Sequence, residues 1–389
     1  MSPKVLFFPV DNGDMSLIEL ENEQTILIDT NIRKDADDPN DKTPDVIAML
    51  RKRLKRDKEG RLYVDVFLLS HPDEDHCLGI SRHFHFGKPE DMTEDKIFIH
   101  EIWSSPMIFR RAQKKEGWTM SADASVFQAE AKRRLKLFRA NDYQVGGPGN
   151  RIKILGEDEG DKTADLESTA IMAKAGDQII NVNEQQDHGM TGRLLAPQHP
   201  SEVVEEEETL SKNNSSVIIQ FSIGCRSNSD ACLFLTGGDA EVAIWECLWK
   251  MYNDTGWFNY NLLQTPHHCS WHSLSYDSWK DCPDPEQSPT AISALSQALP
   301  GALIIASCKP IHDDDNDPPC IGAKRIYKKI TDNVSGLFLC TGEYPSSSAP
   351  DLIEIEITQD GPLEPKKRKD IAPTIISTGA VGRQPLAHG

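Results

Sequence analysis

Four side chains of metal-binding type stand within six residues, in the run His71-Pro72-Asp73-Glu74-Asp75-His76. Imidazole nitrogens and carboxylate oxygens bind zinc well, and carboxylate-rich sites also suit manganese. On an extended backbone, positions 71, 73 and 75 point to one side and His76 to the other, which would divide the ligands between two neighbouring ions. The competing interpretation is an acidic loop that caps a helix, with Asp75 as the N-cap. A buried strand directly before the run favours the metal site.

The elements around this run predict how it is positioned. The apolar segment 64–70 reads as a buried strand that ends at His71. Before it, the sequence predicts strands at 5–10, 15–20 and 25–30 and a helix over 44–56. The order of two paired strands, a helix and a strand therefore places the metal-binding run at the carboxyl end of the last strand.

The second half of the chain repeats this outline. We expect a hairpin from 217–223 and 231–237, a helix over 240–251, and a strand at 260–265 that leads into His267-His268. The two similar halves predict an α/β protein with an αββα sandwich. Residues 88–150 differ, since 106–118 and 122–140 are helical in pattern, and we interpret them as a helical insertion. Residues 1–360 then form one domain, and 361–389 are expected to be a disordered tail.

Composition narrows the class of protein. The 389 residues are 38% hydrophobic and 26% charged, an ordinary globular balance, and the 42 basic against 61 acidic residues give a net charge of −19. That field disfavours a protein that holds duplex DNA through many phosphate contacts. Nine cysteines without a CxxC pair indicate a reducing compartment. With no signal-peptide pattern and no long apolar run, we expect a cytoplasmic protein without membrane contact.

The His-x-Asp-x-Asp-His run after a buried strand resembles the metallo-β-lactamase signature, and Asp73 stands where the commoner pattern has histidine. That variant is similar to the ComEC competence-protein branch. FFPVDNGDMSLIELENEQTILIDT resembles the branch's opening hairpin, with Asp29 at the end of its second strand. LFLTGGDAE and LLQTPHHCSWHS resemble two later motifs. The resemblance spans about 4–345, without 88–190. It implies a metallo-β-lactamase sandwich, Asp239 as a carboxylate bridging two ions, and His267 or His268 as a ligand, with His268 favoured by its distance from the proline.

The sequence departs from the family pattern in three places. The histidine of the third motif has no clear counterpart, and Asn213, Asn214, Ser215 or a water molecule would take its place. Cys269 replaces a glycine after the two histidines. An extra glycine precedes Asp239.

Such a ligand set implies hydrolysis. Two cations roughly 3.5–4 Å apart share a hydroxide and clamp both the attacked centre and its leaving oxygen. We expect two zinc or manganese ions held by His71, Asp73, Asp75, His76, Asp239, His267 and His268, with Asp75 and Asp239 also taking part in catalysis. His272 and Ser270 are candidates for donating a proton or holding a phosphate, although a surface histidine and a turn serine are the plainer explanations. Asp14 either approaches the site or only caps its turn.

The resemblance makes a nuclease that cleaves DNA the first functional hypothesis, in DNA processing or phage defence. The alternatives are hydrolysis of a small substrate, such as a cyclic nucleotide, phosphate ester or lactone, and a non-catalytic partner subunit of the same fold. The basic segments of 106–140, with Trp103 and Trp118, either guide a nucleic acid strand or only decorate exposed helices. Residues 365–369 look like a nuclear localisation signal, for which chance suffices. Partner proteins and oligomeric state stay open.

Overall fold

The computed structural model describes residues 2–38, 40–110, 120–157, 163–186, 189–198 and 216–366. Within these ranges the first sheet has ten strands. Their order is β20 (Gly361–Pro362), β19 (Ile353–Thr358), β1 (Lys4–Phe7), β2 (Ser16–Glu19), β3 (Thr25–Ile28), β6 (Leu62–Leu69), β7 (Phe98–Ser104), β8 (Arg151–Leu155) and β9 (Met172–Ala173), with β5 (Lys55–Arg56) paired to β6.

A second sheet of seven strands lies against the first. Its order is β10 (Gln178–Ile179), β13 (Met190–Ala196), β14 (Ile218–Cys225), β15 (Asn228–Leu235), β16 (Tyr260–Gln264), β17 (Ala298–Ala306) and β18 (Leu337–Cys340). A small ribbon pairs β11 (Asn181–Val182) with β12 (Gln185–Gln186), and β4 (Thr30–Asn31) bridges to residues 77 and 78. The helices are α1 (Val46–Arg51), α2 (Glu74–Cys77), α3 (Ile80–His83), α4 (Met107–Arg110), α5 (Ala122–Ala140), α6 (Val242–Tyr252), α7 (Pro289–Leu295) and α8 (Ile321–Asn333).

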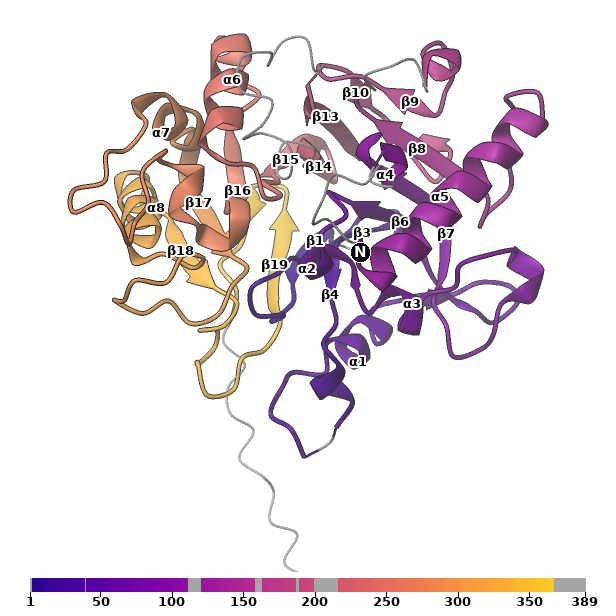
Figure 1. Cartoon of the computed structure of the whole chain (residues 1–389), viewed down its shortest axis with the longest axis horizontal. Helices are drawn as coiled ribbons and strands as arrows, with labels where there is room; N and C mark the ends of the chain where they lie inside the picture. The colour runs from indigo at the N-terminus through magenta and orange to yellow at the C-terminus, as the bar shows by residue number, and fades with distance from the viewer. Residues whose placement is uncertain are drawn as a thin grey trace, which may run out of the picture.

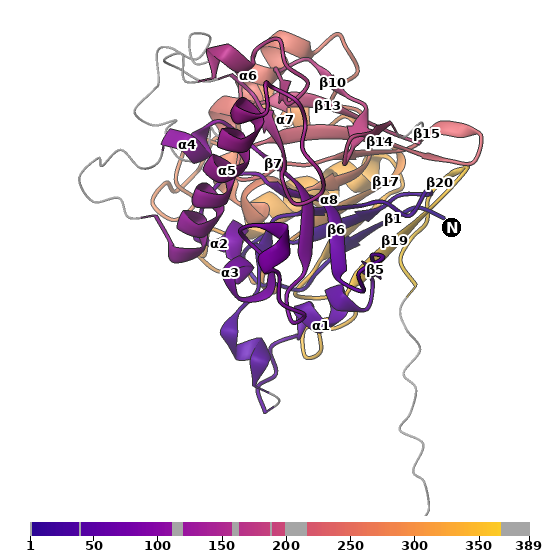
Figure 2. The same ribbon diagram turned by 90° about the vertical axis from the view of Figure 1, so that its right-hand side faces the viewer.

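Three hydrophobic cores define four layers. One core fills the space between the sheets and joins side chains of both, as where the rings of Phe7 and Phe234 meet edge to face at 5.7 Å. A second core lies between the first sheet and helices α1, α3 and α5, and a third between the second sheet and helices α6, α7 and α8. Figure 1 shows helices α6, α7 and α8 on one side of the strands and α1, α3 and α5 on the other, and Figure 2 shows the chain turned by 90°. The predicted αββα sandwich is confirmed.

Each sheet has a parallel centre. Strand β6 runs parallel to β3 and β7, and β16 runs parallel to β15 and β17. Parallel neighbours end at the same edge of a sheet, and open α/β sheets place ligand sites at the carboxyl ends of such strands. The segments that follow β3, β6, β15 and β16 are therefore brought together from four distant parts of the chain.

The interpretation of 88–150 as a helical insertion is wrong in part, because it contains strand β7. This strand pairs with β6 in the middle of the first sheet. His100 and Glu101 interrupt its apolar pattern, yet both are buried. Asn183 contacts both, since its backbone N–H donates to Glu101 Oε2 at 2.9 Å and its side-chain nitrogen lies 3.0 Å from His100 Nδ1. The helix predicted at 122–140 is confirmed as α5.

Two predicted boundaries, the end of the first helix and the start of the tail, differ from those in the structure. Helix α1 ends at Arg51 rather than near 56, because Lys55–Arg56 leaves the helix to pair with β6 as β5. The chain also stays paired to Pro362, two residues into the expected tail, because β20 pairs with β19. The rest of the tail from 367 lies outside the described residues. In the described part of the chain, no helix combines the length and the apolar character needed to cross a membrane.

Candidate metal centre

The first half of the site follows strand β6. Ser70 and His71 continue the strand, and α2 begins at Glu74 with Asp73 as its N-cap residue. Asp75 lies inside this helix, so it is not the N-cap. The Asp73 side chain makes no capping hydrogen bond, and its Oδ2 lies 3.6 Å from His71 Nε2. Asp73 therefore faces His71, and Asp75 faces His268, instead of serving only to start a helix.

Three histidines have a polar neighbour at Nδ1, and the Nε2 of each faces Asp239. Asp29 Oδ2 lies 2.8 Å from Nδ1 of His76, and Asp14 Oδ1 lies 3.4 Å from Nδ1 of His268. Nδ1 of His71 lies 3.1 Å from the Ser70 hydroxyl and 3.4 Å from that of Ser216. Partners of this kind fix the tautomer and ring direction of metal-binding histidines.

The second half of the site follows strands β15 and β16. Two glycines let these segments approach each other. A Cβ on Gly237 would stand 2.8 Å from the backbone nitrogen of Pro266, and one on Gly238 would stand 2.8 Å from the Cβ of Ser216. Gly238 also has a φ of +48°, which disfavours other residues. The extra glycine before Asp239 is thus explained by close packing. The backbone nitrogen of Asp239 donates to the Ser216 hydroxyl at 3.1 Å.

The adjacent histidines lie in an unusual turn. His267 has φ 48° and ψ 49°, His268 has φ 53° and ψ 38°, and Cys269 has φ 66°. Three successive non-glycine residues in the left-handed region cost about 1–2 kcal/mol each. The His267 N–H donates to Gly238 O at 2.8 Å, and its carbonyl accepts from the Ser270 N–H at 2.9 Å. Cys269 packs into the core under α6, α7 and α8.

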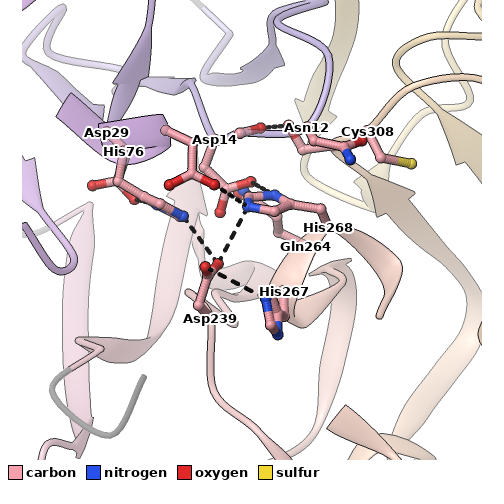
Figure 3. A network of polar contacts seen from close by, with 12 residues as sticks. Asn12, Asp14, Asp29, His76, Asp239, Gln264, His267, His268 and Cys308 are labelled. Atoms are coloured by element: carbon pink, nitrogen blue, oxygen red, sulfur yellow. Dashed lines mark hydrogen bonds and ion pairs between the residues drawn. The ribbon is translucent and has the colours of Figure 1, made fainter. Parts of the chain in front are cut away.

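Asp239 lies at the centre of the site, and its two oxygens face different histidines (Figure 3). Oδ1 lies 2.9 Å from His76 Nε2 and 3.5 Å from His268 Nε2. Oδ2 lies 3.5 Å from His71 Nε2 and 3.9 Å from His267 Nε2. Among the described residues, the compact group of ligand atoms belongs to Asp14, His76, Asp239 and His268, all within 4.8 Å of one another.

The donor set fits a divalent cation. Nε2 of His71, His76 and His268 and Oδ1 of Asp239 are buried without a hydrogen bond in the described structure. Leaving such an atom unsatisfied costs about 1–3 kcal/mol, and here several of them converge on one point. Nitrogen and carboxylate oxygen are the ligands that zinc and manganese accept. These residues therefore form a site that can hold metal.

Electrostatics reinforces this fit. Burial lowers the pKa of His268, but the carboxylates of Asp239, Asp14 and Asp75 outweigh it and raise the pKa to about 10. Burial would raise the pKa of Asp239, yet the imidazoles of His76, His268 and His71 hold it well below its usual range. The Asp239 carboxylate is thus ionised and needs positive charge close by, which protons on the imidazoles or a bound cation can supply.

All seven sequence-predicted ligands lie in this one region. His71, His76, His267 and His268 approach Asp239, Asp73 faces His71, and Asp75 Oδ2 lies 3.3 Å from His268 Nε2. Asn213, Asn214 and Ser215, the expected replacements for the third-motif histidine, lie outside the described residues. Ser216, which follows them, contacts the outer nitrogen of His71.

The two candidate proton donors lie next to this cluster in the sequence. The buried Ser270 hydroxyl donates to Asp317 Oδ1 at 2.7 Å, and His272, which is 44% exposed, has its Nε2 3.8 Å from Asp317 Oδ2. The sequence did not predict that Asp317 is the partner of Ser270 and His272, because Asp317 lies in an acidic loop. Asp14 and Asp29 were visible as acidic residues beside strands, but their histidine partners are 254 and 47 positions away.

Comparisons with known proteins add little beyond this geometry. No protein-family model matches the chain, and no curated protein sequence matches it. Among solved structures, the chain is similar to Igni18, a metallo hydrolase from the hyperthermophilic archaeon Ignicoccus hospitalis KIN4/I. The sequences are 10% identical over 91% of this chain and 100% of that chain, with a TM-score of 0.35. The fold assignment rests on the sheet order and the three cores of this chain.

Proposed function

We propose that this protein is a metal-dependent hydrolase that cleaves a phosphodiester bond. The observation that carries the proposal is the convergence of His71, His76, His267 and His268 on the two oxygens of Asp239. Two zinc or manganese ions are the cofactors that this donor set suits. Bound there, divalent ions would lower the pKa of water and neutralise charge on a phosphate oxygen. Asp239 would hold both ions.

The residues around the ions have distinct tasks in this proposal. Asp29 and Asp14 hold the rings of His76 and His268 so that Nε2 of each stays directed inward. Asp75, whose side chain is 42% exposed, stands at the solvent side of the compact group and contacts His268. It is therefore placed both to complete a metal sphere and to contact a substrate or water that arrives from solvent.

His272 is the candidate for giving a proton to the leaving oxygen. Its Nε2 lies 3.8 Å from Asp317, a carboxylate that Ser270 Oγ and the Trp271 N–H hold in place. The Ser270 hydroxyl donates its hydrogen to Asp317, so in this proposal Ser270 positions Asp317 and His272 instead of donating to the substrate.

DNA remains the first substrate to test, with a nucleotide-sized phosphodiester second.

The basic residues of α5 offer little support for the binding of a long polyanion. Arg134 is buried against Glu130, Arg133 also pairs with Glu130, and Arg139 pairs with Asp165. Trp103 is buried in the core between the sheets. Lys132 and Lys136 remain exposed on that helix. These neutralised arginines and the net charge of −19 favour a small substrate as the alternative.

The test compares single-stranded DNA, double-stranded DNA and cyclic nucleotides as substrates for the whole chain in manganese or zinc, with metal content measured on the same samples. Asp75→Ala is expected to abolish cleavage, and Asp284→Ala, which removes an exposed carboxylate, is the matched control. Equal cleavage by Asp75→Ala and the parent would mean that a contaminant is responsible. Absence of bound metal together with no activity in added manganese or zinc would instead favour a non-catalytic subunit.

A further inference from the structure

We propose that the adjacent residues His267 and His268 bind two different metal ions. His268 joins His76, Asp75 and Asp239 Oδ1 around one ion. His267 joins His71, Asp73 and Asp239 Oδ2 around the other, and so takes the place of the missing third-motif histidine. The inference rests on the proposed metal site. It assigns to each half of that site its own divalent cation.

The backbone of this segment makes the division possible. Neighbouring residues on an extended strand point to opposite faces, so they cannot both face one carboxylate. Residues 267 and 268 instead follow each other in a left-handed turn, with φ values of 48° and 53°. The two rings are inclined at 72°, with centroids 6.0 Å apart. Both Nε2 atoms thereby reach Asp239, but from different sides (Figure 3).

The contacts of each ring assign it to one oxygen. His268 Nε2 lies 3.5 Å from Asp239 Oδ1, the oxygen that His76 Nε2 also approaches at 2.9 Å. His267 Nε2 lies 3.9 Å from Asp239 Oδ2, the oxygen that faces His71 at 3.5 Å. The aspartates of the run 71–76 divide in the same way, since Asp73 faces His71 and Asp75 faces His268.

The turn is also costly to maintain. Left-handed conformations of non-glycine residues persist where the surroundings impose them, and they gather at functional sites. Here the N–H and the carbonyl of His267 are both hydrogen-bonded, and the close approach of Gly237 to Pro266 fixes the start of the turn. In this turn both histidines face the same carboxylate, that of Asp239.

The two halves differ in how far they are preformed. His76 and His268 are 0% and 1% exposed, and each has a carboxylate at its Nδ1. Their ligand atoms already lie within the compact group around Asp239. In the other half His71 is buried as well, but His267 and Asp73 are 18% and 24% exposed and neither belongs to the compact group. Asp75, the remaining ligand of the first half, is 42% exposed and also lies outside that group. Preorganised ligands bind with less loss of freedom, so the His268 half takes the tighter ion and the His267 half the weaker one.

The test is a titration of the metal-free whole chain with Mn²⁺ or Zn²⁺, followed by calorimetry, with elemental analysis after desalting. The parent should bind two ions with different affinities. His267→Asn should keep the tight ion and weaken the second by at least tenfold, whereas His268→Asn should weaken the tight ion. Asparagine tolerates the left-handed region better than most residues, and His267→Gly provides a second variant that fits this backbone. His312→Ala, at an exposed histidine, is the control.

The outcomes separate this inference from the proposed function. A parent that binds no divalent ion removes the proposed function itself. Two unchanged ions in both His267 variants would overturn the inference while leaving a metal site intact. It would also fail if the parent binds one ion only, or if folded His267 variants lose both ions together, because the histidines would then not serve separate ions.

Discussion

Asp29 and His76, 47 residues apart in the chain, are joined by a contact of 2.8 Å between Oδ2 and Nδ1. The same carboxylate accepts hydrogen bonds from the backbone nitrogen and the hydroxyl of Ser70, at 2.7 and 2.6 Å. Asp29 follows β3 and Ser70 follows β6, so one side chain ties the ends of two parallel strands together. It also fixes the direction in which His76 presents its Nε2.

Replacing Asp29 with asparagine is expected to weaken metal binding by about 10- to 100-fold, the usual effect of removing an outer partner of a ligand histidine. The amide would present a neutral group to His76, and the ring would lose its ionic partner. Asp29 has a φ of 55°, which asparagine also adopts, so the backbone should be unaffected.

Competition with a coloured chelator measures this affinity. Asp65→Asn is the matched control, because Asp65 is another buried carboxylate of the same sheet that bonds to Thr25 and Asn183 away from the site. If Asp29→Asn binds metal as tightly as the control does, then the Asp29 contact has no role in orienting the ligand.

Gly237→Ala is expected to displace the histidine turn. The new Cβ would lie 2.7 Å from the Cα of Pro266 and 2.8 Å from its nitrogen, and these backbone atoms cannot move aside freely. Overpacking of this kind lowers the free energy of unfolding by about 1–3 kcal/mol. Metal affinity should fall as well, because Pro266 leads into His267. Urea unfolding and metal titration report the two effects, and Gly147→Ala, with open space around the new Cβ, should change neither.

Divalent metal should stabilise the folded protein. The cluster holds the ionised carboxylates of Asp75 and Asp239 within a few ångströms, and a cation relieves their repulsion. Metal at 100 times its dissociation constant adds about 2.7 kcal/mol to the free energy of unfolding. Thermal unfolding with manganese or zinc, and again after a chelator, measures this shift. Magnesium at the same concentration should act more weakly, because it prefers oxygen ligands, and a parent that responds equally to all three ions would argue against an imidazole site.

Glu130→Gln is expected to lower the free energy of unfolding by about 3–5 kcal/mol, since it leaves the buried Arg134 without its counter-charge. Arg134 Nε and Arg133 both donate to Glu130 Oε1 at 2.7 Å. Arg134 also donates to the carbonyls of Ile99, His100 and Arg151, so it holds α5 against β7 and β8.

The ion pair of Glu130 and Arg134 also predicts that the free energy of unfolding depends on pH. Burial raises the pKa of Glu130, but its bonds to Arg133 and Arg134 outweigh burial and hold the pKa below the usual 4.5. A folded-state pKa below the unfolded one stabilises the protein above about pH 4.5, and this contribution disappears as pH falls through the folded pKa. Chemical unfolding at several pH values should therefore show the parent and Glu130→Gln converging in acid. If the difference in the free energy of unfolding between the parent and Glu130→Gln does not change with pH, the ionic role of Glu130 is contradicted.

The sequence determined much of the local structure and the chemistry of the ligands. Alternating and apolar runs located most strands of both sheets, and the strand before His71 identified the metal-binding run. Strand β7 was missed, because buried His100 and Glu101 look like surface residues until their contacts with Asn183 are known. Periodicity reports which face of an element is apolar, and a buried polar residue with a distant partner breaks that signal.

Only the tertiary structure decided how the candidate ligands are arranged around Asp239. Type and order in the sequence left His267 and His268 as alternatives and gave no partner for Asp14 or Asp317. The answer depends on a left-handed turn and on glycines that let two strand ends touch, at Gly237 and Gly238. These features follow from contacts between segments that lie tens of residues apart in the chain, as between Gly237 and Pro266 or Gly238 and Ser216. Local sequence encodes which atoms can bind a metal, whereas the direction in which each atom points is set by packing across the two sheets.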